Sequence, residues 1–188
     1  MNIEKIEKHF KRLMASLRLD LNDPNYVDTP KRVAKAYKEI CYGLTEEAAE
    51  ELEQITKVTF PATYSEMVVT KDILVWSLCP HHFLPVKMMI NVAYIPESNV
   101  IGLSKIPRLV RILAARPALQ EQLTTDIVQT INDTLNPKGA IVTISGEHLC
   151  MQMRGAKCHG TSVSTTAFVG CFEQESPRAE FFRSIRAK

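Results

Sequence analysis

The sequence lacks an apolar run long enough to span a bilayer. The longest apolar stretches, around residues 86–95 and 139–144, are much shorter than a spanning helix requires. The first five residues, Met1 to Lys5, do not resemble a cleavable signal. Charge of one sign is not in excess either, because 23 Lys and Arg residues are scattered among 21 Asp and Glu residues. We therefore expect a cytoplasmic protein with no membrane or nucleic-acid partner.

The sequence also lacks a disulfide framework. Its five cysteines are an odd number at irregular spacing, which favours reduced thiols in a chain of this size. A thiol near a histidine is then a candidate metal ligand. No internal repeat or low-complexity linker divides the 188 residues, of which 45% are hydrophobic. One compact body preceded by helices is the simplest interpretation.

Apolar periodicity predicts three helices in the N-terminal part. In residues 3–17 apolar side chains recur every three and four positions, which places them along one face of a helix. Asp28 followed by Pro30 is typical of a helix start, so a second helix is expected from Pro30 to about Cys41. Thr45 is expected to cap a third helix that continues to about residue 53.

Further along the chain, segments rich in Val, Ile, Thr and Phe predict strands at residues 57–60, 66–71, 86–95, 140–144, 148–153 and 162–172. Residues 104–135 are predicted to form two helices, with Pro107 in the first turn of one and Pro117 opening the other. A last helix is expected at 177–186. Strands with inserted helices indicate an α+β fold, with a helical region at 1–55 and the strand-bearing domain at 56–188.

The two ends of the predicted sheet raise an edge problem. About four antiparallel strands in a chain of this size leave unpaired strand edges unless another chain pairs with them. Association of several copies into a closed β-barrel would remove those edges, so we expect a homo-oligomer.

Two short segments contain metal-ligand residues. Cys79-Pro80-His81-His82 joins a thiol and imidazoles within one tight turn, and His148-Leu149-Cys150 lies on a predicted strand. Alternate residues of a strand point to the same face, so His148 and Cys150 are expected to project together. Cys79, His82 and Cys150 would then provide three ligands, leaving the fourth position open to water as in catalytic zinc sites.

Other interpretations of these residues exist. A buried cysteine is often simply a small hydrophobic side chain, and a histidine often only satisfies a hydrogen bond in the core. A structural zinc site would need a fourth protein ligand, which Cys158 or His159 could provide. The donor set suits zinc best without excluding iron or cobalt.

Seven segments resemble, in the same order, signature stretches of the GTP cyclohydrolase I family. These include Cys79-Pro80-His81-His82 with its flanks and His148-Leu149-Cys150 with the residues that follow it; the full set is 29–35, 77–83, 92–96, 100–105, 116–117, 120–124 and 148–155. The resemblance covers nearly the whole chain. It implies a tunnelling fold, in which an antiparallel sheet has helices on one face, here with an N-terminal helical extension. In that family the strands form pentameric barrels, two of which pair into a decamer with active sites at subunit interfaces.

The resemblance also implies an activity and its residues. Zn²⁺ held by Cys79, His82 and Cys150 would serve hydrolytic opening of GTP at C8, followed by loss of formate and rearrangement to 7,8-dihydroneopterin triphosphate. His81 and His148 match the two histidines that move protons. Gln120 and Glu121 match the pair that holds the ribose and the guanine edge. The triphosphate binders implied are Ser104, Lys105, Arg108 and Arg154, with Arg32 and Lys35 from a neighbouring subunit.

The sequence departs from the family pattern at two places. Pro80 stands where the family usually has Glu, and Lys87-Met88-Met89 replaces a stretch that commonly contains glycine. A lost carboxylate could alter the polar network around the histidines. One alternative is therefore a catalytically silent or altered-specificity nucleotide-binding ring protein. Another is a nitrile reductase on the same fold, which would need a nucleophilic cysteine and no zinc.

Overall fold

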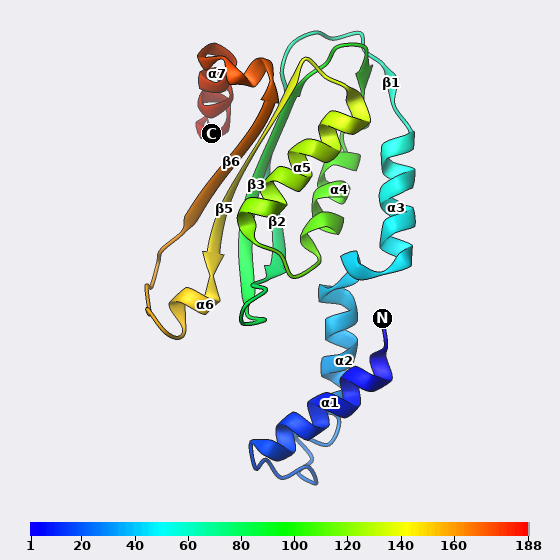
Figure 1. The fold of residues 1–188 in the computed structure, drawn as a ribbon, viewed down its shortest axis with the longest axis vertical. Helices are drawn as coiled ribbons and strands as arrows, with labels where there is room; N and C mark the ends of the chain where they lie inside the picture. Colours follow the sequence, from blue (N-terminus) through cyan, green and yellow to red (C-terminus); the bar gives the residue numbers. More distant parts are fainter. Residues whose placement is uncertain (188) are drawn as a thin grey trace.

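The computed structural model describes residues 1–187. It contains a sheet with helices on both sides and a helical arm at one end (Figure 1). The α-helices are α1 (Ile3–Ser16), α2 (Thr29–Ile40), α3 (Glu46–Lys57), α4 (Lys105–Ala114), α5 (Gln120–Leu135), α6 (Leu149–Gln152) and α7 (Glu175–Arg186). The strands are β1 (Phe60–Pro61), β2 (Val68–Leu78), β3 (Pro85–Ile95), β4 (Asn99–Val100), β5 (Gly139–His148) and β6 (Val163–Gly170). Two 3₁₀ turns, η1 (Tyr42–Leu44) and η2 (Cys171–Glu173), complete the set.

The main sheet has four strands in the order β2-β3-β5-β6, and all neighbours are antiparallel. Side chains alternate between its two faces, so every second residue faces the main core. Val75, Met88 and Val142 are among the core-facing residues, each at most 5% exposed. The predicted α+β class with an antiparallel sheet is therefore confirmed.

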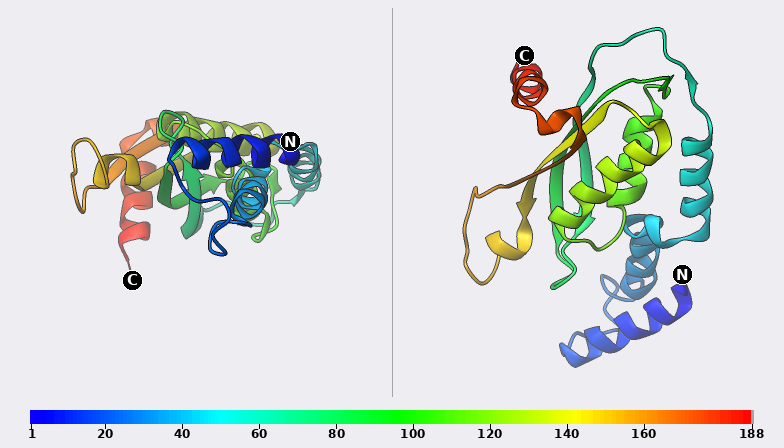
Figure 2. Two further views of the ribbon diagram at one scale, coloured as in Figure 1. Left: turned by 90° about the horizontal axis from the view of Figure 1, so that it is seen from below. Right: turned by 45° about the horizontal axis from the view of Figure 1, so that its top comes forward.

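Helices α4 and α5 cover one face of this sheet, as Figures 1 and 2 show. Their apolar residues, including Leu109, Leu123 and Ile127, are fully buried against the strands. Helix α7 packs on the other face, where Phe172 and Phe181 bury Ala93 and Ile141 at the end of the sheet far from the N-terminus. The remainder of that second face stays open between β2 and β5.

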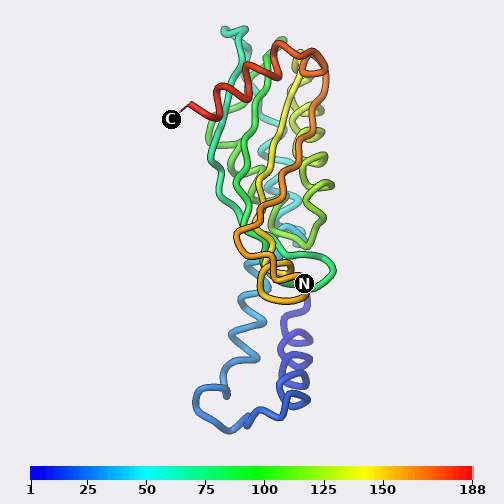
Figure 3. The backbone as a smooth tube through the Cα atoms, turned by 90° about the vertical axis from the view of Figure 1, so that its left-hand side faces the viewer, coloured from blue at the N-terminus to red at the C-terminus, as the bar shows by residue number. Residues whose placement is uncertain are grey.

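The N-terminal hairpin of α1 and α2 projects beyond the sheet, whereas α3 lies alongside α4 (Figure 3). Thr45 caps α3 as predicted, because its hydroxyl accepts a hydrogen bond from the Ala48 amide at 3.2 Å. Ala48 and Ile55 belong to the main core. The division of the chain into 1–55 and 56–188 stays a prediction. Within residues 1–187, no helix is both long and apolar enough to cross a membrane.

Several element boundaries differ from the predicted ones. Of the strand expected at 57–60, only Phe60 lies in a strand, the short β1, because α3 continues to Lys57, with Ile55 packed into the core. The strand expected at 66–71 runs to Leu78 through a bulge at Asp72, whose backbone adopts a φ of 60° and whose amide donates to Asn91 Oδ1 at 2.9 Å. The predicted strand at 148–153 is wrong, since β5 ends at His148 and α6 follows.

Two helix starts also differ from expectation. Helix α5 begins at Gln120 rather than at Pro117, which instead forms a bridge with Leu78 at the end of β2. Helix α2 carries Pro30 in its first turn as predicted, but the Asp28 side chain makes no capping hydrogen bond and pairs with Arg32 at 3.4 Å.

Candidate metal centre and active site

Antiparallel topology brings four chain segments to the same end of the sheet. They are the turn between β2 and β3, the start of α5, the end of β5, and α6 with the loop that follows it. Figure 1 shows these segments near the helical arm, at the end opposite α7. Eight of the predicted site residues lie on them: Cys79, His81, His82, Gln120, Glu121, His148, Cys150 and Arg154.

The turn after β2 is fixed by its backbone. The Phe83 amide donates to the Cys79 carbonyl at 2.8 Å, and the Cys79 amide donates to the Leu84 carbonyl at 2.9 Å. Pro80 occupies the position directly after Cys79 in this single helical turn, where no amide hydrogen is needed. The departure at Pro80 is therefore compatible with a turn that presents Cys79 and His82 on one side.

The same end of β2 is tied to the start of α5. The hydroxyl of Ser77, which is 1% exposed, donates to the Arg116 carbonyl at 2.8 Å. The Ala118 amide donates to the Leu78 carbonyl at 3.3 Å. These bonds hold the segment before Gln120 against the segment before Cys79, so the turn and helix α5 are placed relative to each other.

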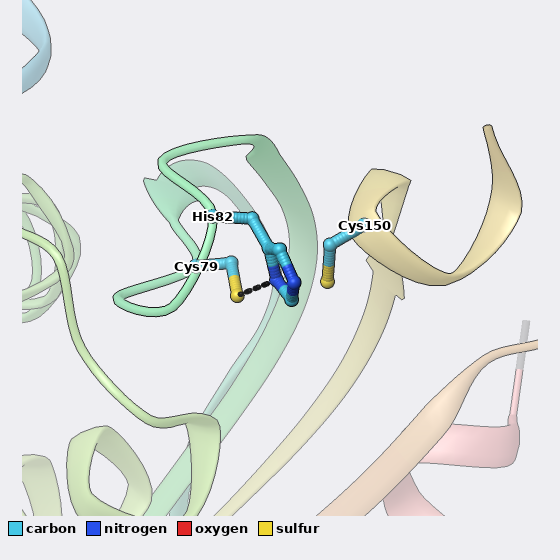
Figure 4. A group of neighbouring side chains, drawn as sticks. All are labelled: Cys79, His82 and Cys150. Carbon is cyan, nitrogen blue, oxygen red and sulfur yellow. Dashed lines mark hydrogen bonds between the residues drawn. The ribbon is translucent and has the colours of Figure 1, made fainter. Parts of the chain in front are cut away.

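Cys79, His82 and Cys150 form the one cluster of potential metal ligands found within residues 1–187, with their donor atoms within 4.8 Å of one another (Figure 4). Cys79 Sγ lies 3.7 Å from His82 Nδ1. A tetrahedral zinc with bonds of about 2.3 Å to sulfur and about 2.0 Å to nitrogen holds those atoms about 3.5 Å apart. The donors thus fit zinc in type and spacing, although Cys150 comes from the first turn of α6 and not from a strand.

A fourth protein ligand is not part of this cluster. Cys158 and His159, the candidates for a closed structural site, are absent from the group of clustered donors within the described chain. The Cys158 thiol instead faces the Ala156 carbonyl, 3.6 Å away. Cys79 is buried, Cys150 is partly buried and His82 is exposed. The cluster is therefore open on the side of His82, as a catalytic site requires.

Arg154 contacts the cluster directly. Its Nη1 lies 2.8 Å from His82 Nε2. A guanidinium only donates hydrogen bonds, so Nε2 is the acceptor and the ring proton lies on Nδ1. If Nδ1 held a metal ion, the ring proton would lie on Nε2, which could not accept from Arg154. The guanidinium would then be free to bind another acceptor, such as an anionic substrate.

Burial and charge act on the thiol of Cys150. Burial raises the pKa of Cys150 above its usual value, and the hydrogen bond with Cys79 and the charge of Cys79 raise it further. The Arg154 guanidinium opposes the shift. The unligated thiol therefore keeps its proton. A divalent cation between the two sulfurs would reverse this balance, because a coordinating thiol is deprotonated.

His148, at the end of β5, lies beside the cluster and is held by Gln120. His148 Nε2 is 2.8 Å from Gln120 Oε1. Burial lowers the pKa of His148, and the nearby negative charge of Glu121 partly opposes that shift. His148 is thus favoured as a neutral imidazole. Glu121 is exposed in the first turn of α5, where a carboxylate is accessible to a ligand.

His81 is the second predicted proton carrier. It is exposed on the same turn as the ligands, with Nδ1 3.9 Å from Cys79 Sγ and its ring centroid 6.3 Å from that of His82. The structure therefore brings both predicted acid-base histidines next to the cluster, with His81 on the turn of Cys79 and His82 and with His148 at the end of β5, just before Cys150.

The predicted triphosphate binders do not converge on this cluster within one chain. Lys105 begins α4 at the far end of the sheet, and α4 spans 10 residues, or about 15 Å. Lys105 Nζ donates to the Ile55 and Val58 carbonyls at 3.2 and 2.9 Å, and Arg108 pairs with Glu51 at 2.8 Å. Ser104 is exposed at the same helix start. These cations stabilise the contact between α4 and α3 in a single chain.

Arg32 and Lys35 lie on α2 and are exposed. Arg32 pairs with Asp28 across one helical turn at 3.4 Å, with both side chains largely in solvent. Such a pair contributes little to stability, so the guanidinium can be released at small cost. Neither residue lies on the four segments that form the candidate site.

Three residues of the site were not singled out from the sequence. Thr165 and Thr124 bond to each other and to Gln120, and Gly146 lies where a side chain would collide with the Gln120 amide. Gly146 interrupts an otherwise Val- and Ile-rich strand, a pattern that marks close approach of another group. This glycine in a strand was the one feature of the sequence that could have indicated the close approach of Gln120.

Fold and site together define an α+β protein with an open cluster of two cysteines and one histidine that could hold a metal ion. The partly buried His148, favoured as a neutral imidazole, and the cation of Arg154 lie beside this cluster. This combination is typical of hydrolytic enzymes that use a metal and acid-base residues together.

Comparison with known proteins identifies the particular family. The sequence profile described as GTP cyclohydrolase I matches residues 6–186. A protein named GTP cyclohydrolase 1 from Clostridium perfringens is 38% identical over 183 residues, covering 97% of each chain. Another of that name from Desulforamulus reducens is 43% identical over 181 residues, covering 95% of each chain. The chain belongs to the GTP cyclohydrolase I family.

Among solved structures, an archaeosine synthase QueF-Like in the apo form matches with a TM-score of 0.44 and 19% identity, covering 58% of this chain and 96% of that chain. A likeness at that level carries no argument about function. The antiparallel sheet with α4 and α5 on one face agrees with the tunnelling fold expected for the family.

Proposed function

We propose that this protein catalyses the hydrolytic opening of GTP at C8, with release of formate and rearrangement to 7,8-dihydroneopterin triphosphate, the first step of pterin and folate biosynthesis. The observation that carries the proposal is the open cluster of Cys79, His82 and Cys150 beside His148. Membership of the GTP cyclohydrolase I family supports the choice of substrate. All five cysteines are free, and we place the reaction in the cytoplasm, where thiols stay reduced.

Cys79, His82 and Cys150 would hold Zn²⁺. When bound, the metal supplies the Lewis acidity that activates water for the hydrolytic step. His148, with a pKa lowered by burial, acts as a proton acceptor at neutral pH. His81, exposed on the turn that carries Cys79 and His82, exchanges protons with the opened ring and with solvent. Together the two histidines serve the proton transfers of ring opening and rearrangement.

Glu121 recognises guanine in this proposal. Its exposed carboxylate accepts two N–H groups from the guanine edge. Adenine lacks that pattern and would leave the carboxylate unpaired in the bound state, which costs affinity. Arg154, next to His82, binds a phosphate group of the same substrate.

The site is completed by other copies of the chain. Lys105, Arg108 and Ser104 lie at the far end of α4 from the cluster, so a triphosphate bound near Arg154 would reach them only on a neighbouring chain. Arg32 and Lys35 would be contributed in the same way. Both β2 and β6 are edge strands of the sheet, which favours barrel closure by several chains. We propose a homodecamer of two pentamers.

Formate release and pterin fluorescence after oxidation, followed with the zinc-loaded protein and GTP, test the proposal. We expect stoichiometric formate and pterin, both abolished by removing the metal with a chelator. Formate without pterin would show ring opening without rearrangement. GTP binding without either product would replace the proposal with a silent nucleotide-binding ring, and Pro80→Glu would then test whether the missing carboxylate is the cause.

A further inference from the structure

The side chain of Gln120 is enclosed in the protein rather than open to a ligand. It is 2% exposed, although it begins a helix whose next residue, Glu121, is exposed. Its Nε2 lies 2.9 Å from the Val163 carbonyl, 3.1 Å from Thr165 Oγ1 and 3.2 Å from the Ile144 carbonyl. Its Oε1 faces His148. Every polar atom of the amide already has a protein partner.

These contacts fix the orientation of the amide. Carbonyl oxygens only accept hydrogen bonds, so the amide nitrogen must face Val163 and Ile144 and the amide oxygen must face His148. An amide oxygen also only accepts. His148 Nε2 therefore carries a hydrogen and donates it to Gln120, which leaves Nδ1 as the ring nitrogen available for chemistry.

Two threonines hold the amide from behind. Thr124 Oγ1 donates to the Gln120 carbonyl at 2.7 Å and lies 2.7 Å from Thr165 Oγ1. Since the Thr124 hydrogen is used on that carbonyl, Thr165 donates to Thr124 and accepts from the Gln120 amide. The hydrogens from His148 to Gln120 and from Thr165 to Thr124 then each have one possible direction, while the two amide hydrogens of Gln120 are shared among Thr165 Oγ1 and the Val163 and Ile144 carbonyls.

Gly146 makes the arrangement sterically possible. A Cβ at this position of β5 would collide with Oε1 of Gln120 and stand 3.2 Å from His148 Nε2. Because Gly146 has no Cβ, the Gln120 side chain can lie against this position of β5 and reach from α5 to His148 and β6.

We propose that Gln120 is a positioning residue, held by Thr165 and admitted by Gly146, that sets the ring orientation and the proton-bearing nitrogen of His148 and does not bind the ribose. This inference rests on the proposed function for its rate measurements. It assigns Gln120 a role different from the substrate contact that the family resemblance implies.

A comparison of kcat with KM tests the assignment. In Gln120→Leu we expect kcat to fall about 100-fold with KM for GTP changed less than about twofold, because a misplaced proton carrier slows the chemical step without removing a substrate contact. Gln122→Leu is the matched control, since Gln122 lies two residues further along α5, is exposed, and its side chain bonds to Asp126. A tenfold or larger rise in KM with kcat nearly unchanged would overturn the proposal.

Thr165 provides a second variant that does not empty the pocket. Thr165→Val removes the hydroxyl that receives the Gln120 amide, and we expect kcat to fall about 10-fold at constant KM. Thr165→Ser keeps the hydroxyl and should restore kcat to within about twofold of the parent protein. Equal losses in the Val and Ser variants would show a packing role for Thr165 and overturn the proposed chain of hydrogen bonds.

Crystal structures of the parent protein and Thr165→Val separate this inference from the proposed function. Should the parent protein not turn over GTP, the function fails, but the positioning role still predicts one His148 ring orientation in the parent and a rotated or divided one in the variant. An unchanged His148 ring in Thr165→Val and Gln120→Leu would overturn the inference whatever the activity.

Discussion

At the level of single residues, Cys150 is the ligand that joins two distant segments into one cluster, because Cys79 and His82 share a turn and Cys150 lies on α6. Replacing its sulfur with oxygen in Cys150→Ser removes a soft ligand from a site that has only three. We expect bound zinc, measured by elemental analysis after dialysis, to fall from one per chain to below about a tenth, with formate release lost.

Cys158→Ser is the matched control for Cys150→Ser. Cys158 follows α6 in the sequence, but its thiol faces the Ala156 carbonyl and stays outside the cluster. Zinc content and formate release should equal those of the parent protein. Loss of zinc in the Cys158 variant would indicate a four-ligand structural site and contradict the open centre.

The sequence predicted all three ligands, but the structural reasoning was right for Cys79 and His82 and wrong for Cys150. Cys79 and His82 share one turn, so their proximity follows from local geometry. Cys150 was expected to point with His148 along a strand, but the strand ends at His148. The helical turn of α6 still directs the thiol to the same cluster, which only the tertiary structure reveals.

Residue type alone did not predict how the polar residues are engaged. Gln120 could contact substrate or protein, and its burial depends on the gap at Gly146, which belongs to a different element. Lys105 and Arg108 have the charge to bind phosphate, yet in one chain they bond to α3. Such partners lie about 50 residues or more away in sequence, beyond the reach of any local pattern.

At the level of elements, η1 contacts the end of α4 at one glycine. The Gly43 amide donates to the Ala115 carbonyl at 2.8 Å, and a Cβ on Gly43 would collide with the Ile112 carbonyl. We expect Gly43→Ala to lower the free energy of unfolding by about 1–3 kcal/mol, because backbone atoms cannot yield as a flexible side chain can. Urea denaturation followed by circular dichroism measures the change.

Gly102→Ala is the control for Gly43→Ala. The atom nearest to its added Cβ would be the flexible Lys105 side chain at 3.8 Å, which is an ordinary contact. The free energy of unfolding should change by less than about 0.5 kcal/mol. Equal effects of the two substitutions would show that the contact of η1 with α4 is not tightly packed.

The contact between α3 and α4 should depend on pH. Hydrogen bonds from Arg108 first, and then from Tyr42, hold the pKa of Glu51 below its usual value. A lowered folded-state pKa gives stability that is present above the unfolded-state pKa and is lost as pH falls through the folded-state pKa. Glu51→Gln should therefore lower Tm at pH 7, by the equivalent of about 1 kcal/mol or less.

The difference in Tm between Glu51→Gln and the parent protein should narrow as pH falls below about 4, where the parent carboxylate becomes protonated. Glu50→Gln is the control, since Glu50 is exposed on the same helix. A difference in Tm that stays constant from pH 7 to pH 3 would contradict a stabilising role for the Glu51 carboxylate.

The helices were easier to predict than the strands. Amphipathic periodicity and the Thr45 cap depend on nearby residues, so α1, α2 and α3 were found close to their observed bounds. Strand β2 was predicted too short because the polar pair at Lys71 and Asp72 resembles a strand end. The sheet tolerates it as a bulge, with the Asp72 amide bonded to Asn91 on the neighbouring strand.

At the level of the whole molecule, the two parts of the proposed site, the metal-ligand cluster and the triphosphate-binding cations of α4, lie apart in a single chain. The cluster with Arg154 lies at one end of the sheet, and Lys105 lies at the other end of α4. If each site combines the cluster of one chain with the Lys105 of a neighbour, the protein must associate to act. Ten chains of 21.2 kDa make about 212 kDa, which native mass spectrometry measures directly.

Mixed oligomers of two inactive variants distinguish a shared site from one contained in a single chain. Cys150→Ser destroys the cluster, and Lys105→Met removes the ammonium while keeping most of the side-chain length. The two variants are co-expressed in equal amounts, and mixed oligomers are purified through two different tags. If the site is shared, random assembly places an intact cluster opposite an intact Lys105 at about a quarter of the interfaces. We therefore expect formate release at about a quarter of the parent rate, whereas each variant alone is inactive.

A site contained in one chain gives a different result. Every chain in the mixture then carries one of the two defects, so no mixed particle would be active. The size and Tm of Lys105→Met alone must match the parent protein, because Lys105 also bonds to the end of α3. With those matched, an inactive mixture would show that Lys105 acts in the site of its own chain, and the proposed sharing of the site between chains would be wrong.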